Sequence, residues 1–440
     1  MKNNNKVRFI DLFAGLGGIR IGFEQAALET GFKAECVFTS EIKTSAIAAL
    51  QNNFEHHDLA GDITKIHANQ IPDFDVLLAG FPCQAFSVAG KQKGFVDTRG
   101  TLFFDIERIL EEKKPHGFIL ENVEGLVLHD RLNKSDKIGQ TLETILNSLK
   151  KKYKVNYRVL DSKEFGVPQS RRRIFIVGTR KKIINLENFD KHINTVGTIL
   201  ENDVEFSNTK FSKLLLKYYK PEELEGKFIK DKRGGSKNIH SWDIEAKGKV
   251  SNVQKELLNR LFKERRKKHW ATKIGIDWMD GMPLTHDQIG SFFNHKDLHK
   301  FLDDLVEKGY LTLEHPKKKI LTNDAPPVFD RVPDTTKPKG YNITSGKLSF
   351  EYSHFLNPNA IAPTLVAMDM DTIGVVGEKG IRKLTIREGL RLFGFPDTYN
   401  LDFLCDSELN KRKAYDLLGN SVCVPVVKAV SKRLLENLEL

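Results

Sequence analysis

The stretch that decides the fold is DVLLAGFPCQ, residues 75–84. Its apolar half, residues 75–79, predicts a buried parallel strand. The strand ends at Gly80, and Pro82 fixes a backbone angle just before Cys83. Cys83 is therefore expected at the carboxyl end of a strand, where open α/β sheets bind their ligands. A thiol in that place is a candidate nucleophile, although most free cysteines are small buried hydrophobic residues.

Strand-like and helical patterns alternate on both sides of this stretch. Strands are expected over residues 7–13, 34–40, 116–120, 153–160 and 173–177. Apolar residues at helical spacing follow the first strand and also occupy 102–110 and 138–149. This alternation predicts a doubly wound α/β domain with a mostly parallel sheet over residues 1–185.

Composition narrows the class of protein. The chain has 440 residues, of which 40% are hydrophobic and 29% charged, as in ordinary globular proteins. It has no apolar run long enough to span a membrane and no signal-like start, and we expect a cytoplasmic protein. Its 4 cysteines lie far apart, so neither a disulfide framework nor a metal site is expected. The net charge of +11 is typical of a nucleic-acid binder.

A glycine-rich turn follows the first strand. Phe13, Gly15 and Gly17 form the pattern FxGxGG, and a helix comes next. Strand, glycine turn and helix together indicate a nucleotide-type site, although a ligand without phosphate fits equally well. Glu41 and Asp62 then stand at the ends of the next two expected strands, where an acidic residue usually binds ribose hydroxyls.

The spaced blocks of this chain, taken in order, resemble those of bacterial cytosine-C5 DNA methyltransferases of restriction–modification systems. The resemblance covers residues 1–180 and roughly 360–440, and is weakest in the middle. The matching blocks are 11–18, 80–87, 90–95, Glu121-Asn122-Val123, the QxRxR motif from Gln169, 363–365, 382–396 and 419–422.

The resemblance assigns the chemistry to four residues. Cys83 would add to carbon 6 of cytosine, which makes carbon 5 nucleophilic enough to take a methyl group. Glu121 would bind N3 and the exocyclic amine and donate a proton, which requires a raised pKa. Arg173 would contact the O2 oxygen of the base, and Arg171 would help to hold the site.

The cofactor implied by the resemblance is S-adenosyl-L-methionine. Phe13 would pack on the adenine, Glu41 would bind the ribose hydroxyls, and Asp62 would bind the adenine amine. The remaining residues expected at the cofactor are Gly15, Gly17, Ile42, Ile63, Pro82, Asn420 and Ser421. Ile42 departs from relatives that carry an aromatic residue there, and we expect this to change affinity rather than the ligand.

Double-stranded DNA is the implied partner, and the target cytosine must be flipped out of the helix to reach Cys83. The loop 87–101, with Ser87, Lys91 and Arg99, is expected to close on the DNA. Thr364 belongs to a Thr-Leu pair that the family uses for recognition.

The middle of the chain matches no well-known block, and residues 186–407 are predicted to form a smaller target-recognition domain. Residues 408–440 are predicted to return to the catalytic domain. Within the middle, a helix is expected over 252–270, followed by two helices and a basic hairpin in a winged-helix-like order. Lys317, Lys318 and Lys319 in that hairpin either contact DNA or are simply solvated.

The sequence thus predicts a monomeric DNA cytosine-5 methyltransferase, which would protect DNA from a partner restriction endonuclease. Two alternatives remain open. One is a tRNA cytosine-5 methyltransferase, which shares the chemistry but usually has a shorter middle region. The other is a non-catalytic DNA-binding regulator on the same fold.

Overall fold

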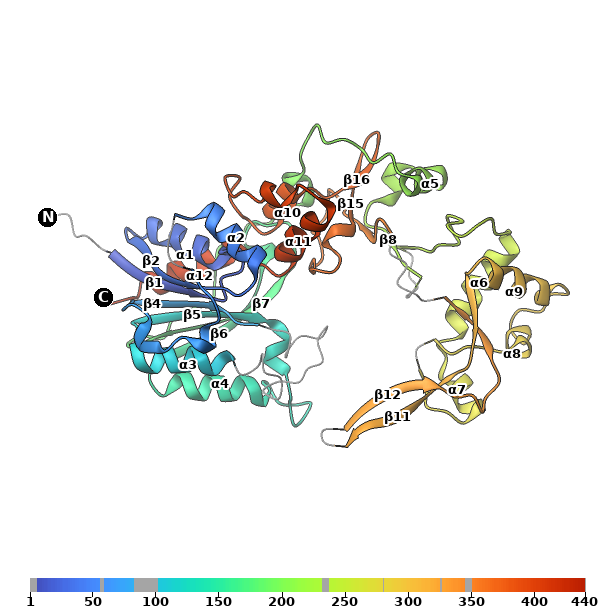
Figure 1. The fold of residues 1–440 in the computed structure, drawn as a ribbon, viewed down its shortest axis with the longest axis horizontal. Helices are drawn as coiled ribbons and strands as arrows, with labels where there is room; N and C mark the ends of the chain where they lie inside the picture. Colours follow the sequence, from blue (N-terminus) through green and yellow to red (C-terminus); the bar gives the residue numbers. More distant parts are fainter. Residues whose placement is uncertain are drawn as a thin grey trace. The chain divides into compact units, whose positions relative to one another are not determined.

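The fold was obtained as a computed structural model (Figure 1). It describes residues 6–55, 59–82, 102–231, 237–279, 281–324, 327–344 and 350–439. Contacts divide the chain into two compact units. Unit 1 contains Met1–Val204, Asn357–Asp371 and Leu384–Leu440, and unit 2 contains Glu205–Leu356 and Thr372–Lys383.

Unit 1 is built on a seven-stranded sheet with the order β3-β2-β1-β4-β5-β7-β6. The strands are β1 (Lys6–Leu12), β2 (Lys33–Ser40), β3 (Leu59–Ala60), β4 (Val76–Gly80), β5 (Gly117–Val123), β6 (Lys154–Asp161) and β7 (Arg172–Thr179). Neighbouring strands are parallel except that β7 runs antiparallel to both β5 and β6. The predicted doubly wound, mostly parallel α/β fold is confirmed.

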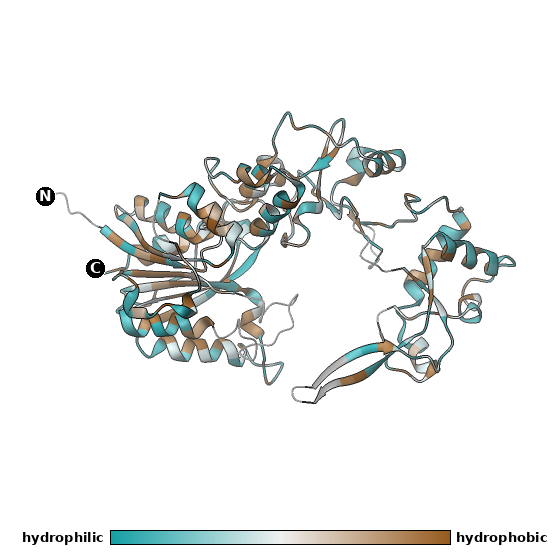
Figure 2. Ribbon diagram, viewed as in Figure 1, coloured by the Kyte–Doolittle hydropathy of each residue, from teal (hydrophilic) through white to brown (hydrophobic). Residues whose placement is uncertain are grey.

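Helices cover both faces of this sheet (Figure 1). They include α1 (Gly18–Glu29), α2 (Thr44–Asn53), α3 (Leu102–Lys113), α4 (Gln140–Lys150) and α12 (Val424–Leu435). Unit 1 also contains α10 (Ile386–Leu392) and α11 (Glu408–Gly419). Alternate strand residues such as Ile10 and Leu77 share a fully buried core with Phe103 of α3 and Ile145 of α4. Figure 2 shows the resulting pattern, with hydrophobic strands inside and hydrophilic outer faces on α3 and α4.

The chain's last helix packs on its first. A Cβ atom at Gly22 of α1 would lie 2.7 Å from Cβ of Val427 and 2.9 Å from the carbonyl oxygen of Val424, both in α12. Only a glycine therefore allows these helices to approach so closely. The end of the chain therefore packs on the unit that contains its start.

The contact-based units differ from the predicted boundaries at 185/186 and 407/408. Residues 357–371 and 384–407 group with the sheet of unit 1, although the sequence placed them in the recognition domain. Long-range contacts explain the difference. Tyr399 donates to the carbonyl of Leu16 at 2.7 Å, and the amide of Gln169 donates to the carbonyl of Leu392 at 3.0 Å.

Unit 2 has two hydrophobic cores. One lies beneath a five-stranded sheet and includes Tyr352 and Phe355. Its elements are α5 (Lys210–Tyr218), β8 (Phe228–Ile229), β9 (Asn238–Ile239), β14 (His354–Phe355), β15 (Ile373–Gly377) and β16 (Gly380–Lys383). The other core includes Trp242, Leu261 and Leu302.

In the rest of unit 2 the two helices follow in the predicted order, but the predicted hairpin, with the lysines 317–319 between strands at 310–314 and 320–321, is wrong. Residues 311–314 pair with 340–343, and residues 317–324 pair with 327–333. The elements of this part of unit 2 are α6 (Asn252–Glu264), α7 (Lys268–Ile274), α8 (His286–Gly290), α9 (Leu298–Glu307), β10 (Leu311–Glu314), β11 (Lys317–Asp324), β12 (Pro327–Pro333) and β13 (Gly340–Ile343). Strand β10 pairs antiparallel with β13, and Leu284 bridges to Tyr341 on the other side of β13. The three lysines 317–319 lie within β11 itself.

The single helix predicted over 252–270 is wrong, because the chain breaks between α6 and α7. Arg265 is buried at the break, and its guanidinium donates to the side-chain oxygen of Asn342 at 2.6 Å. Its carbonyl accepts from the backbone N–H of Met282 at 2.8 Å. These long-range bonds turn the backbone out of the helix, which the local pattern could not reveal. No helix among the described residues is long and apolar enough to cross a membrane.

Candidate functional site

The carboxyl ends of β1, β2, β4 and β5 share one edge of the sheet. In unit 1, the predicted site residues that the structure describes lie on the strand ends and loops of this edge. The order of the sheet reverses at β1, since α1 leads to β2 on one side while β4 lies on the other. Such a switch point leaves a crevice in which ligands bind.

The glycine turn at the end of β1 has an unusual backbone. Phe13, Gly15 and Gly17 have φ values of 57°, 55° and 71°. A positive φ is uncommon for a non-glycine residue such as Phe13. A Cβ atom at Gly17 would lie 2.6 Å from the ring of Phe54, whereas one at Gly15 would meet nothing within 4 Å. The turn therefore leaves open space above Gly15, while Gly17 is required by packing.

Glu41 is fixed directly to this turn. One carboxylate oxygen accepts from the backbone N–H of Gly15 at 2.8 Å. The other accepts from the N–H groups of Ile42 and Lys43, each at 2.8 Å. These bonds hold the carboxylate at the strand end, where it is positioned to accept hydroxyl groups of a ligand. The side chain of Ile42 is 72% exposed, so it offers an aliphatic surface at the same place.

Asp62 caps a short 3-10 helix, η1 (Ile63–Lys65). Its carboxylate accepts from the hydroxyl of Thr64 at 2.8 Å and from the Thr64 N–H at 3.1 Å. These hydrogen bonds, with Lys65 nearby, lower the pKa of Asp62, so it stays ionised. Ile63 is buried beneath it.

Asp11 is a buried carboxyl group near the turn, and no role was predicted for it. It is fully buried, and neither carboxylate oxygen has a hydrogen-bond partner in the part of the chain that the structure describes. Burial raises its pKa to about 8, with Arg20 opposing and Glu24 and Glu41 reinforcing the shift. A buried acid without a partner fits a ligand that carries a positive charge, as S-adenosyl-L-methionine does.

Glu121 and Arg173 form the charged pair at the end of β5. The carboxylate of Glu121 lies 3.1 Å from Nε of Arg173, and these side chains are only 13% and 17% exposed. Burial raises the pKa of Glu121, while Arg173 and then Arg171 lower it. The pairing of β4 with β5 places Glu121 directly opposite Gly80, three residues before Cys83. A buried carboxyl with a raised pKa can hold and donate a proton near neutral pH.

Arg171 is a buried connector. Its guanidinium donates to the carbonyl of Leu365 at 2.9 Å and to that of Gly419 at 2.9 Å, and it lies 5.1 Å from the ring centroid of Phe393. Arg171 thus joins β7 to two segments from the end of the chain. These contacts suit the predicted holding role and leave Arg173 as the arginine that faces the acid.

Asn122 is a further residue of the site that received no individual role from the sequence. It is buried, and its amide donates to the carbonyl of Phe81 at 3.2 Å. Its side-chain oxygen accepts from the N–H of Val123 at 2.8 Å. Asn122 therefore anchors the backbone that leads through Pro82 toward Cys83.

Asn420 and Ser421 lie between α11 and α12. Asn420 is exposed, and its amide donates to the carbonyl of Asp416 at 2.8 Å. The carboxylate of Asp416 pairs with Lys43, which brings this segment beside the loop that follows Glu41. Ser421 is buried. The structure therefore brings Asn420 close to the residues expected to bind ribose.

Some predicted residues are placed elsewhere or are not described. The hydroxyl of Thr364 donates to the carbonyl of Ser170 at 2.6 Å, beside the QxRxR segment. Lys318 and Lys319 pair with Asp334 at 3.6 Å and Asp277 at 3.5 Å in unit 2. Cys83, Ser87, Lys91 and Arg99 lie outside the described residues.

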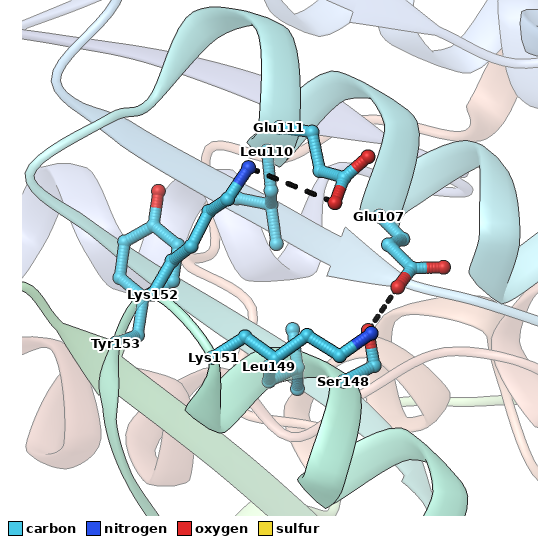
Figure 3. Close-up of a pocket in the computed structure, with 8 residues that line it drawn as sticks. All are labelled: Glu107, Leu110, Glu111, Ser148, Leu149, Lys151, Lys152 and Tyr153. Atoms are coloured by element: carbon cyan, nitrogen blue, oxygen red, sulfur yellow. Dashed lines mark hydrogen bonds and ion pairs between the residues drawn. The ribbon is translucent and has the colours of Figure 1, made fainter.

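A small pocket between α3 and α4 does not belong to this site (Figure 3). It is lined by Glu107, Leu110, Glu111, Ser148, Leu149, Lys151, Lys152 and Tyr153. The lining comes from the last turns of both helices and the loop before β6, so it lies at the amino ends of the strands. Lys152 pairs with Glu111 across it at 3.6 Å, and Ser148 bonds to Glu107.

This chain is similar in sequence and in fold to known proteins. Residues 7–436 match the family model of C-5 cytosine-specific DNA methylase. The chain is 56% identical to the type II methyltransferase M.NlaIV of Neisseria lactamica, over 98% of this chain and 100% of that protein. It is 41% identical to M.HgiCI of Herpetosiphon aurantiacus, over 99% of both. The solved structure of a methyltransferase from Entamoeba histolytica, EhMeth, is 17% identical, covers 99% of both chains, and has a TM-score of 0.53, which shows a shared fold.

Proposed function

The chain belongs to the C-5 cytosine-specific DNA methylase family, and from this premise we propose which of its residues perform each part of the reaction. It is a DNA cytosine-5 methyltransferase of the restriction–modification type. S-adenosyl-L-methionine supplies the electrophilic methyl group.

Cys83 is the proposed nucleophile. Its thiolate forms a bond to carbon 6 of the flipped cytosine while Glu121 delivers a proton to N3, so that electron density reaches carbon 5. Carbon 5 would take the methyl group from the cofactor, which would be left as S-adenosylhomocysteine. Solvent would then take the carbon 5 proton, the carbon 5–carbon 6 double bond would re-form as the bond to the Cys83 thiolate breaks, and N3 would return its proton to Glu121. The attack on carbon 6 would place negative charge on N3, and the proton from Glu121 neutralises that charge as it develops, which makes the addition favourable.

The observation that carries this proposal is the buried Glu121–Arg173 pair at the strand end beside Gly80. Burial raises the pKa of Glu121 and so favours its protonated form, which is the form that donates. Arg173 keeps the side chain oriented and presents its remaining N–H groups to the oxygen of the base. Arg171 keeps the strand in place through its bonds to Leu365 and Gly419.

The residues proposed to hold the cofactor surround the glycine turn. Glu41 is fixed to accept hydroxyl groups, Asp62 is ionised to accept an amine, and Phe13 offers a half-buried ring. The further members of this proposed site are Gly15, Gly17, Ile42, Ile63, Pro82, Asn420 and Ser421. Asp11 adds a buried carboxyl group without a hydrogen-bond partner among the described residues, and a cationic ligand beside it would favour its ionised form.

Duplex DNA is the proposed substrate form, and the reading of its sequence is assigned to unit 2. Ser87, Lys91, Arg99 and Thr364 are proposed to contact the DNA around the flipped base. Of the three lysines predicted for the hairpin, Lys317 and Lys319 are proposed to contribute affinity, whereas Lys318 pairs with Asp334. We further propose that the enzyme acts as a monomer and protects host DNA from a partner endonuclease. Unit 2 is large, with Glu205–Leu356 and Thr372–Lys383. Its size favours an enzyme that recognises duplex DNA over a tRNA methyltransferase, which usually has a shorter middle region.

Bisulfite sequencing of a host that expresses the protein tests this function. We expect one short sequence to become methylated at a fixed cytosine throughout the genome, and a host expressing the Cys83→Ser variant to lack the mark. A genome without added 5-methylcytosine, from a soluble protein that binds S-adenosyl-L-methionine, would contradict the proposal.

A further inference from the structure

The hairpin of β11 and β12 in unit 2 is a two-stranded sheet on its own. Where burial is described, at residues 317–321 and 330–333, none of its residues belongs to either core of unit 2. The consecutive residues Lys318, Lys319, Ile320 and Leu321 are all exposed, so both faces of this ribbon meet solvent. An isolated pair of strands is marginally stable in water, which points to a partner on one of its faces.

The register of the ribbon separates its charges by face. Residues that pair directly point to the same side, and the pairs alternate between the two faces. Lys317 pairs with Pro333 and Lys319 with Arg331, which gives one face three cations. On the other face, Lys318 pairs with Val332 and Ile320 with Asp330. We call these the Lys319 face and the Lys318 face.

Lys319 and Arg331 stand directly opposite each other on the Lys319 face. Like charges in that arrangement destabilise a strand pair, and an anion placed against them would relieve the repulsion. In the structure the carboxylate of Asp277 pairs with Lys319 at 3.5 Å, and the guanidinium of Arg331 donates to the carbonyl of Trp278 at 3.3 Å. Among the side chains that the structure describes, Asp277 is thus the exposed acid that faces the cations of this side.

The segment that holds Asp277 extends the same basic surface. Trp278 is 39% exposed, and the ammonium of Lys268 lies 5.8 Å from the centre of its ring. The Lys319 face therefore continues through Trp278 to the start of α7. On the opposite side, Lys318 already pairs with Asp334, and Asp330 adds a second acid.

We propose that the Lys319 face of the ribbon binds the phosphate backbone of duplex DNA and that the Lys318 face does not. This rests on the proposed function, because the occupant is the substrate of the enzyme. The row of cations with one competing carboxylate matches a polyanion, and the phosphates of a duplex provide a regular one. The lysine side chains are flexible point charges, which suit phosphates rather than base edges.

Single substitutions on the two faces provide a matched comparison. Lys318 and Lys319 are neighbours, with side chains 48% and 45% exposed, and each pairs with one aspartate. The full-length variants Lys318→Ala, Lys319→Ala and Arg331→Ala would be titrated with a cognate duplex and an unrelated duplex, over a range of salt concentrations. Thermal melting of each variant would show that the fold is kept.

Lys319→Ala and Arg331→Ala are each expected to weaken binding of both duplexes by about three- to tenfold. Each should also lower the slope of log affinity against log salt by up to about 0.9, the value for one phosphate contact. Lys318→Ala should leave affinity and slope unchanged. Asp277→Asn should tighten binding to both duplexes, because it removes the competing carboxylate.

Equal losses for Lys318→Ala and Lys319→Ala, or no change in slope for Lys319→Ala and Arg331→Ala, would overturn the assignment of the face. A loss confined to the cognate duplex would also overturn it, since the contact would then be to bases. These outcomes are separate from the proposed function, which fails only if the wild-type protein methylates no cytosine.

Discussion

Glu121 is held at the end of β5 with Arg173 against it and little exposure to solvent. Glu121→Gln keeps the shape of the side chain but cannot release a proton to the base. We expect kcat/KM for methylation to fall roughly 10²–10⁴-fold, the usual contribution of a general acid. Binding of S-adenosyl-L-methionine, measured by calorimetry, should be unaffected.

The control is Glu124→Gln, three residues further on. Glu124 pairs with Arg172 at 2.8 Å on the surface, where an ion pair contributes little. Its substitution should leave the methylation rate close to wild type. Full activity in Glu121→Gln would remove the proton donor from the proposed mechanism.

Asp11 makes a prediction about pH. Its pKa is about 8 in the folded protein and 3.8 as a free carboxyl, so the folded state binds one proton more between these values. Stability therefore falls as pH rises through this window and levels off above about 8. Asp11→Asn removes this dependence.

Urea denaturation of the cofactor-free protein between about pH 6 and pH 9 measures how the free energy of unfolding depends on pH. The stability gained by Asp11→Asn over wild type should grow from pH 6 to pH 8 and then stay constant. A gain that is independent of pH would show that Asp11 is ionised in the folded protein and paired by another group.

The sequence predicted site residues where the signal is local. Phe13, Gly15 and Glu41 follow their strands directly, and the structure joins Glu41 to Gly15 by a hydrogen bond. Asp11 was overlooked, because a single acid at the end of an apolar strand gives no sign of its burial. The acceptors of Arg171 lie 194 and 248 positions away, so no local pattern could reveal them.

At the scale of elements, β7 is tied to the late segments of the chain through Arg171. Arg171→Ala would strand the buried carbonyls of Leu365 and Gly419 and remove the contact with Phe393. Each buried group left without a partner costs about 1–3 kcal/mol, so we expect a loss of about 2–5 kcal/mol in the free energy of unfolding. Urea denaturation measures this loss.

The neighbouring Arg172 is the control for this prediction. Its side chain is 55% exposed and pairs with Glu124, so Arg172→Ala should cost no more than about 1 kcal/mol. If Arg171→Ala unfolded at the same urea concentration as wild type, Arg171 would not be the connector described above.

Helices and strands were predicted well where the local pattern of apolar residues determines them. They were predicted less well where contacts with distant parts of the chain determine them. The strand before Cys83 and the helices α3 and α4 have clear periods and were found. The break between α6 and α7 was not, because Arg265 leaves the helix to reach Asn342, which is 77 positions away. The pairing of β10 with β13 around the β11–β12 ribbon likewise depends on contacts beyond any local window.

At the scale of the molecule, the chain runs through unit 1, unit 2 and unit 1 again, with a further exchange over Thr372–Lys383. The sequence predicted that the chain leaves the catalytic domain once and returns to it once, since the blocks that resemble the family lie at both ends of the chain. It could not show that residues 357–371 and 384–407 group with the sheet, because those assignments come from bonds such as Tyr399 to Leu16. The residues proposed for the chemistry lie in unit 1, and we propose that unit 2 reads the DNA.

The central claim is that Cys83 attacks the cytosine, and duplex DNA with 5-fluorocytosine at the target position tests it most directly. Fluorine at carbon 5 blocks the elimination that would free the enzyme, so the protein should remain covalently attached to the DNA when S-adenosyl-L-methionine is present. Peptide mapping by mass spectrometry should place the attachment at Cys83, and Cys83→Ser should form none. An adduct at Cys36, Cys405 or Cys423, or no adduct from protein that methylates the unmodified duplex, would contradict the account.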